Sequence, residues 1–168
     1  SARSPVESLF YMLEVANNQA TRPGDAAVYS AHWGDAYFLK GYALVELRRL
    51  PEAEAALRAA IALAPRNSQY LTELGQVQLR QRNLAGALES FTAAEAAVEF
   101  SPPQSKNLEL GRALRGQGYV QIENRQLDAA EALYKRALAL DAGDRHALGQ
   151  LGYIQSLRGG RPGAGATQ

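Results

Sequence analysis

The side chains in this sequence that could do chemistry are few, and their spacing favours structural roles. His32 and His146 are the only histidines and lie far apart in the chain. Cysteine is absent, which excludes disulfides, thiolate metal sites and cysteine nucleophiles. Asp141, Asp144 and His146 are close enough in sequence to suggest metal ligands. A turn in which Asp144 caps the next helix explains this spacing better, so we predict no metal site.

Other sequence patterns that could indicate catalysis are not supported by their surroundings either. None of the serines lies in a nucleophile elbow. Gly116-Gln117-Gly118 falls within an expected helix, and neither a preceding strand nor a following Gly-Lys-Ser/Thr supports a phosphate loop. Glu52 and Glu54 lie at an expected helix start, where the helix dipole favours acidic side chains. These patterns predict a protein that is not an enzyme and needs no cofactor.

Composition indicates a helical domain without a strong charge. The 168 residues include 18 Lys and Arg against 17 Asp and Glu, a net charge of +1. This balance gives no electrostatic reason to expect nucleic acid or an anionic membrane as a partner. Alanine and leucine dominate, which favours helix, and no apolar run approaches the roughly 20 residues that span a bilayer. We expect a soluble cytoplasmic or periplasmic domain, and the preference for Arg over Lys favours a bacterial source.

The elements that position these residues repeat along the chain. Gly41, Gly75, Gly118 and Gly152 occur in similar contexts (LKGY, ELGQ, GQGY and QLGY) and are separated by 34, 43 and 34 residues. The middle spacing is one period with nine inserted residues. A period of 34 residues is typical of stacked helical hairpins. The aligned copies are 34–67, 68–101 and 111–144, followed by a single helix of a fourth copy at 145–158.

Small and bulky residues recur at fixed positions within each copy. The twentieth position is Ala53, Ala87 or Ala130, the twenty-fourth is Leu57, Phe91 or Tyr134, and the twenty-seventh is Ala60, Ala94 or Ala137. With the glycine at the eighth position, this pattern resembles the tetratricopeptide repeat family. The resemblance implies an all-α, right-handed superhelical solenoid of helix-turn-helix repeats. The small residues would lie where the two helices of a hairpin cross, and the bulky residue would fill the space beside the next hairpin.

The residues at the helix ends and in the insertion support further predictions. Asn67 and Asp144 end their repeats where the next helix needs an N-cap. In the insertion, 102–110, Ser101 followed by two prolines resembles a helix start, which predicts a first helix of the third repeat running from there to about Asn124. The alternative is a nine-residue surface loop.

The two ends of the chain depart from the repeat. In residues 1–31 an apolar stripe predicts a helix, followed by a loop, that caps the first repeat; alternatively, this segment occupies the groove as a pseudo-ligand. Residues 32–158 form the expected repeat domain, and the Gly-rich residues 159–168 a flexible tail. The start at Ser1 without methionine and the Gly-rich tail lead us to expect part of a longer protein.

The family resemblance implies that the first helices of the repeats line a concave groove. Carried over by repeat position, the expected groove residues are Phe38, Tyr42, Gln69, Thr72, Gln76, Arg80, Arg112, Arg115, Tyr119, His146 and Tyr153. The remaining groove positions of the repeats hold Asp35, Val45, Glu46, Leu79, Ile122, Glu123, Gly149, Ser156 and Leu157. Tyrosine and arginine are enriched at binding hot spots. Alternatively, the tyrosines pack between neighbouring helices and contact no ligand.

This set predicts a protein or peptide partner that carries apolar side chains and at least one carboxylate. Repeat domains that clamp the acidic tails of heat-shock chaperones use Lys and Asn at the fifth and ninth positions of the first repeat. Those positions hold Phe38 and Tyr42 here, so the two-carboxylate clamp is missing. We expect a scaffold or adaptor. The alternatives are a self-associating module that forms homo-oligomers, or the regulatory part of a larger enzyme or of a cell-envelope assembly or secretion system.

Overall fold

The computed structural model describes residues 26–159, and the side chains of residues 33–159. The described part contains seven α-helices, one 3-10 turn and no strand. The elements are α2 (Ala26–Glu46), α3 (Leu50–Leu63), α4 (Ser68–Arg80), α5 (Leu84–Ala97), η1 (Val98–Phe100), α6 (Lys106–Glu123), α7 (Leu127–Leu140) and α8 (Arg145–Arg158).

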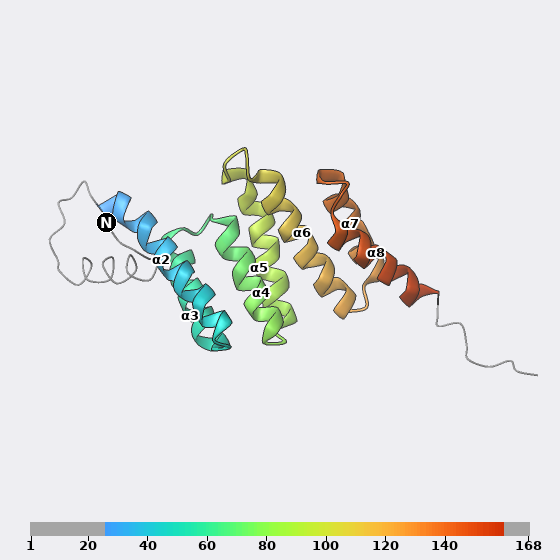
Figure 1. Cartoon of the computed structure of the whole chain (residues 1–168), viewed down its shortest axis with the longest axis horizontal. Helices are drawn as coiled ribbons and strands as arrows, with labels where there is room; N and C mark the ends of the chain where they lie inside the picture. Colours follow the sequence, from blue (N-terminus) through green and yellow to red (C-terminus); the bar gives the residue numbers. More distant parts are fainter. Residues whose placement is uncertain (1–25, 160–168) are drawn as a thin grey trace, which may run out of the picture.

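The helices form three antiparallel hairpins that stand side by side along the molecule (Figure 1). The hairpins are α2/α3, α4/α5 and α6/α7, and α8 packs against α7 and α6 at the far end. The predicted all-α solenoid of helix-turn-helix repeats is therefore confirmed. The chain forms this array because each hairpin has an apolar face that only a neighbouring hairpin can bury.

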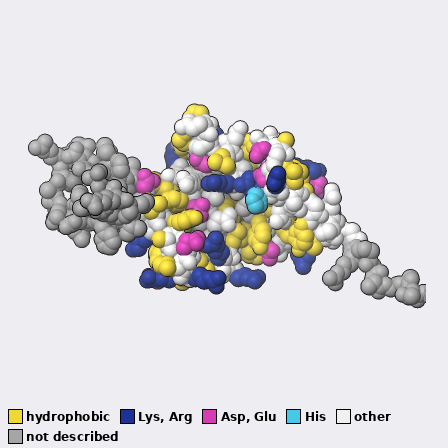
Figure 2. Space-filling model, in the orientation of Figure 1, with side chains coloured by type: hydrophobic (Ala, Val, Ile, Leu, Met, Phe, Trp, Pro, Cys, Tyr) yellow, Lys and Arg dark blue, Asp and Glu magenta, His cyan; other side chains and the backbone are white. Residues whose placement is uncertain are grey.

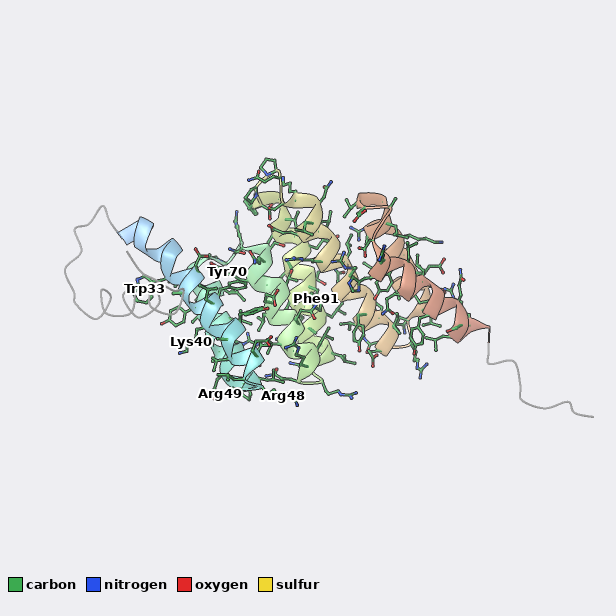
Figure 3. All side chains as sticks on the ribbon, viewed as in Figure 1. Trp33, Lys40, Arg48, Arg49, Tyr70 and Phe91 are labelled. Carbon is green, nitrogen blue, oxygen red and sulfur yellow. The ribbon has the colours of Figure 1, made fainter. Side chains whose placement is uncertain are left out.

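Glycine and alanine bring the two helices of each hairpin close together, as predicted. A Cβ on Gly41 would lie 2.9 Å from Leu57 Cγ, and one on Gly75 would lie 2.7 Å from Phe91 Cε1. Phe91, fully buried and labelled in Figure 3, also fills the space beside the next hairpin, since a Cβ on Gly116 of α6 would lie 2.5 Å from its ring. Only glycine accommodates these contacts without displacing the side chain of Leu57 or the ring of Phe91.

Gly152 is the exception among the repeat glycines. A Cβ there would meet nothing within 4 Å, because no second helix of the described chain lies against this face of α8. The opposite face of α8 is anchored by Ala147 and Ile154, which are fully buried against the third hairpin.

The turn inside each hairpin has the same backbone conformation, with an arginine at positive φ. The φ angles are 58° at Arg48, 65° at Arg82 and 62° at Arg125. In the second turn the Arg82 N–H donates to Leu79 O at 3.0 Å, and the next N–H reaches back to Gln78 O at 2.9 Å. This pattern ends a helix in the left-handed conformation that glycine usually adopts.

Two predictions of helix starts need correction. The helix expected from Ser101 begins at Lys106, because Ser101 to Ser105 form a turn in which the Ser105 N–H donates to Pro102 O at 3.0 Å. The insertion is therefore neither helical from Ser101 nor a nine-residue surface loop. It consists of a turn followed by the start of α6, a lengthened helix of 18 residues. At the start of the chain, α2 begins at Ala26, so residues 26–31 belong to the first hairpin and not to a preceding loop.

The predicted helix caps are confirmed. The Asn67 side chain accepts the Tyr70 N–H at 3.2 Å at the start of α4. Asp144 Oδ1 accepts the N–H groups of His146 and Ala147 at 3.0 and 3.1 Å at the start of α8. The predicted N-terminal capping helix, its alternative as a groove ligand, and the tail beyond Gly159 lie outside the described residues.

Candidate functional site

A hollow of about 940 Å³ opens between α4, α6 and α8, the first helices of successive repeats. In the view of Figure 2, Lys and Arg side chains and a histidine gather over the middle of this face, beside hydrophobic side chains. The residues that line it are Thr72, Glu73, Gln76, Leu79, Arg80, Arg82, Leu84, Arg112, Arg115, Gly116, Tyr119, Glu123, Tyr134, His146 and Gln150.

Seven of the eleven predicted groove residues line this single hollow. They come from three helices that are far apart in sequence. They are Thr72, Gln76, Arg80, Arg112, Arg115, Tyr119 and His146.

The other four predicted residues lie outside the hollow. Gln69, Tyr42 and Tyr153 are exposed to solvent without lining it. Phe38 packs between helices instead: its ring stacks on Tyr70 of α4, with centroids 5.1 Å apart and planes inclined by 22°. The first helix, α2, thus contacts α4 through a stacked aromatic pair, and within residues 33–159 none of the residues that line the hollow comes from α2.

Tyr70 also ties the first two hairpins together through its hydroxyl. The hydroxyl donates a hydrogen bond to Asp35 Oδ1 of α2, and Tyr70 itself is buried. Burial raises the pKa of the Tyr70 hydroxyl, and the Asp35 carboxylate raises it further, so the hydroxyl stays protonated and keeps donating.

Arg115 is held by the protein itself at the floor of the hollow. Its Nη1 lies 2.5 Å from Asp144 Oδ2, and Asp144 caps α8 with its other oxygen. Burial alone would raise the pKa of Asp144, but the Ala147 N–H, the Arg115 guanidinium and the His146 N–H outweigh it and hold that pKa below its usual value. Arg115 therefore joins α6 to α8 and is at the same time one of the residues that line the hollow.

The other three arginines of the hollow are available for a ligand. Arg80, Arg82 and Arg112 are exposed, and within residues 33–159 none of them takes part in an ion pair. Unpaired guanidinium groups that converge on one hollow can bind a carboxylate through two parallel hydrogen bonds.

Glu73 opposes these arginines at the wall of the hollow. Burial raises the pKa of its carboxyl, although the nearby guanidinium groups of Arg112 and Arg80 lower it. Glu73 forms no ion pair with either arginine within residues 33–159, so its carboxylate reduces the positive potential of the hollow without neutralising it.

Sequence reasoning missed six lining residues: Glu73, Arg82, Leu84, Gly116, Tyr134 and Gln150. Two signals could have identified some of them. Arg82 shares its repeat position with Arg48 and Arg125, a recurrence that marks the turn. Glu73 directly follows a predicted groove residue on the same helix.

Within the described residues, no group of three or more His, Cys, Asp or Glu side chains could hold a metal ion. None of the helices in residues 26–159 is long and apolar enough to cross a membrane.

This arrangement of stacked hairpins with a hollow along their first helices defines a helical repeat protein. The family model of the tetratricopeptide repeat matches residues 38–102 and 107–162, so the chain belongs to the tetratricopeptide repeat family. Such repeats are protein-interaction modules.

Solved structures share this fold at low sequence identity. The first tetratricopeptide domain of Spaghetti (RPAP3) bound to the HSP90 peptide SRMEEVD is 18% identical, with a TM-score of 0.68 over 77% of this chain and 96% of that one. The Arabidopsis OM64 domain is 17% identical, with a TM-score of 0.67 over 75% and 97% of the two chains. The second domain of human RPAP3 in complex with the HSP70 peptide SGPTIEEVD is 16% identical, with a TM-score of 0.63 over 77% and 98%. No curated protein matches the chain.

Proposed function

We propose that this protein is an adaptor that binds an extended, acidic segment of a partner protein in the hollow between α4, α6 and α8. The observation that carries the proposal is the convergence of Arg80, Arg82 and Arg112, none of them in an ion pair within residues 33–159, on one hollow. Leu79 and Tyr119 supply apolar contact area beside these charges. The arginine- and alanine-rich composition supports a bacterial source for such an adaptor.

The structural relatives support the class of ligand rather than a particular peptide. Two of them hold peptides that end in Glu-Glu-Val-Asp. In this chain none of the described side chains of α2 lines the hollow, so the first helix contributes no cation there. The arginines of α4, of the turn after it and of α6 would contact the carboxylates instead.

The test is a selection from a random dodecapeptide library on the full chain, followed by affinity measurements with synthetic peptides. We expect enrichment of Asp and Glu, and a loss of at least tenfold in affinity for Arg112→Glu. The matched control is Arg145→Glu, an exposed arginine in the first turn of α8 that does not line the hollow. Equal loss in both variants, or in neither, would refute the proposal.

A second candidate, self-association, has one observation in its favour. The face of α8 that carries Gly149 and Gly152 meets nothing within 4 Å of an added Cβ, and Leu148 and Tyr153 of the same helix are half-exposed. Sedimentation over a concentration series distinguishes the two functions, since an adaptor that acts alone stays a single monomeric species at every concentration.

A further inference from the structure

Arg82 occupies a place that its two counterparts do not share. The turns of all three hairpins present an arginine at positive φ, at Arg48, Arg82 and Arg125. A cation at the end of a helix is favoured by the helix dipole, which accounts for the type of residue at all three positions. Of the three, only Arg82 lines the hollow.

Arg82 shares the hollow with two residues from the C-terminal part of α6, Tyr119 and Glu123. Leu84, two residues after Arg82 in the chain, lines it as well. Burial and the Glu123 carboxylate raise the pKa of Tyr119, whereas Arg82 lowers it, which indicates that the three side chains are within electrostatic reach of one another. Arg80, from the last turn of α4, also lines the hollow, and its charge, like that of Arg112, lowers the pKa of Glu73.

Arg112 is the second positive centre of the hollow. It lies within electrostatic reach of Glu73 of α4. Arg112 and Tyr119 are seven residues apart on α6, and seven residues of helix rise about 10 Å. A bound segment in the extended polyproline II conformation advances about 3.1 Å per residue and presents every third side chain on the same face, so two acids three residues apart lie about 9 Å from each other on the side that faces the hollow.

We propose that Arg82 is a specificity-determining residue, which pairs with a second acidic side chain of the bound segment about three residues from the one that faces Arg112. The partner motif is therefore an extended Asp/Glu-x-x-Asp/Glu, in which one acid meets Arg112 and the other meets Arg82. This inference rests on the proposed function and adds the spacing of the ligand's charges.

The three turn arginines make a matched set of variants. Replacing each with glutamine removes the charge while keeping a polar, unbranched side chain at the same positive φ. The probes are peptides selected on the wild-type chain, each also synthesised with either acid changed to its amide. We expect Arg82→Gln to weaken binding about tenfold, Arg48→Gln and Arg125→Gln to weaken it less than twofold, and Arg82→Lys to restore part of the loss.

A double-mutant cycle identifies the pair directly. Changing the second acid to its amide should weaken binding to the wild type about tenfold and have almost no further effect on Arg82→Gln. If Arg82→Gln binds as tightly as Arg125→Gln while Arg112→Glu still loses affinity, the groove function stands and the assignment of Arg82 is refuted. If neither the Arg82 nor the Arg112 variant loses affinity, or if no peptide is selected, both the assignment of Arg82 and the proposed function are refuted.

Discussion

Asp144 fixes the position of Arg115 across the junction between the third hairpin and α8. Arg115 Nη1 lies 2.5 Å from Asp144 Oδ2, and the side chain of Asp144 is only 6% exposed. One carboxylate therefore caps a helix and anchors a groove arginine at once. An arginine that the sequence assigns to ligand binding thus also holds the fold together.

This pairing predicts that Arg115→Gln destabilises the protein by about 1–3 kcal/mol, because it leaves a buried carboxylate without its charged partner. Arg112→Gln, which breaks no ion pair, should change the free energy of unfolding by less than about 0.5 kcal/mol. Urea unfolding of both variants checks the difference. Similar stabilities for the two variants would contradict the structural role of Arg115.

The same carboxylate predicts a pH dependence. The pKa of Asp144 is held below its usual value of 3.8 in the folded protein, so its contribution to stability is present above that value and lost as the pH falls through the folded pKa. The stability difference between the wild type and Asp144→Asn should therefore be largest near neutral pH and shrink below about pH 4. Unfolding measured from pH 7 to pH 2.5 tests this, and a difference that does not change with pH would contradict it.

Two glycines at the same repeat position should respond in opposite ways. Gly75→Ala places a Cβ against the ring of Phe91 and should cost about 1–3 kcal/mol through overpacking. Gly152→Ala meets open space in α8 and should stabilise the protein by up to about 1 kcal/mol, because alanine favours helix. Thermal unfolding of the two variants shows whether each substitution raises or lowers the stability of the protein. A loss of stability in Gly152→Ala would show that another helix covers this face.

Glu73 should limit the affinity of the hollow for acidic peptides. Glu73→Gln removes a negative charge beside Arg112 and should strengthen their binding roughly two- to fivefold at neutral pH. Because burial raises the pKa of Glu73, the charged carboxylate also costs folding free energy at neutral pH. Glu73→Gln should therefore be more stable than the wild type at pH 7, and this gain should vanish below the usual pKa of 4.5, where the carboxyl is protonated in both the folded and the unfolded chain.

The three repeat tyrosines should differ in binding, although they share one repeat position. Tyr119→Ala should weaken peptide binding by about tenfold, because its ring lines the hollow. Tyr42→Ala and Tyr153→Ala should change affinity less than twofold, since both rings are exposed outside it. Fluorescence anisotropy with one selected peptide compares all three variants, and equal losses would contradict the boundaries of the hollow.

Much of the fold could be predicted from local patterns. The 34-residue spacing of Gly41 and Gly75 indicated the hairpins, and the recurring alanines and bulky residues indicated how each hairpin closes. The caps at Asn67 and Asp144 were also predictable, because a cap depends on a few adjacent residues. The start of α6 was placed too early, because the two prolines at 102–103 fit a turn as well as a helix start.

The composition of the candidate site was decided by contacts between helices. Repeat position alone assigned Phe38 and Arg115 to the ligand, whereas packing engages the ring of Phe38 with Tyr70 and the guanidinium of Arg115 with Asp144. Packing likewise brings Arg82 into the hollow and leaves the equivalent Arg48 outside it. The sequence by itself determined which helices form and which small residues let them cross, because those preferences act within one repeat. Only the tertiary structure decided which side chains meet in the hollow, because that depends on how successive hairpins are placed against one another.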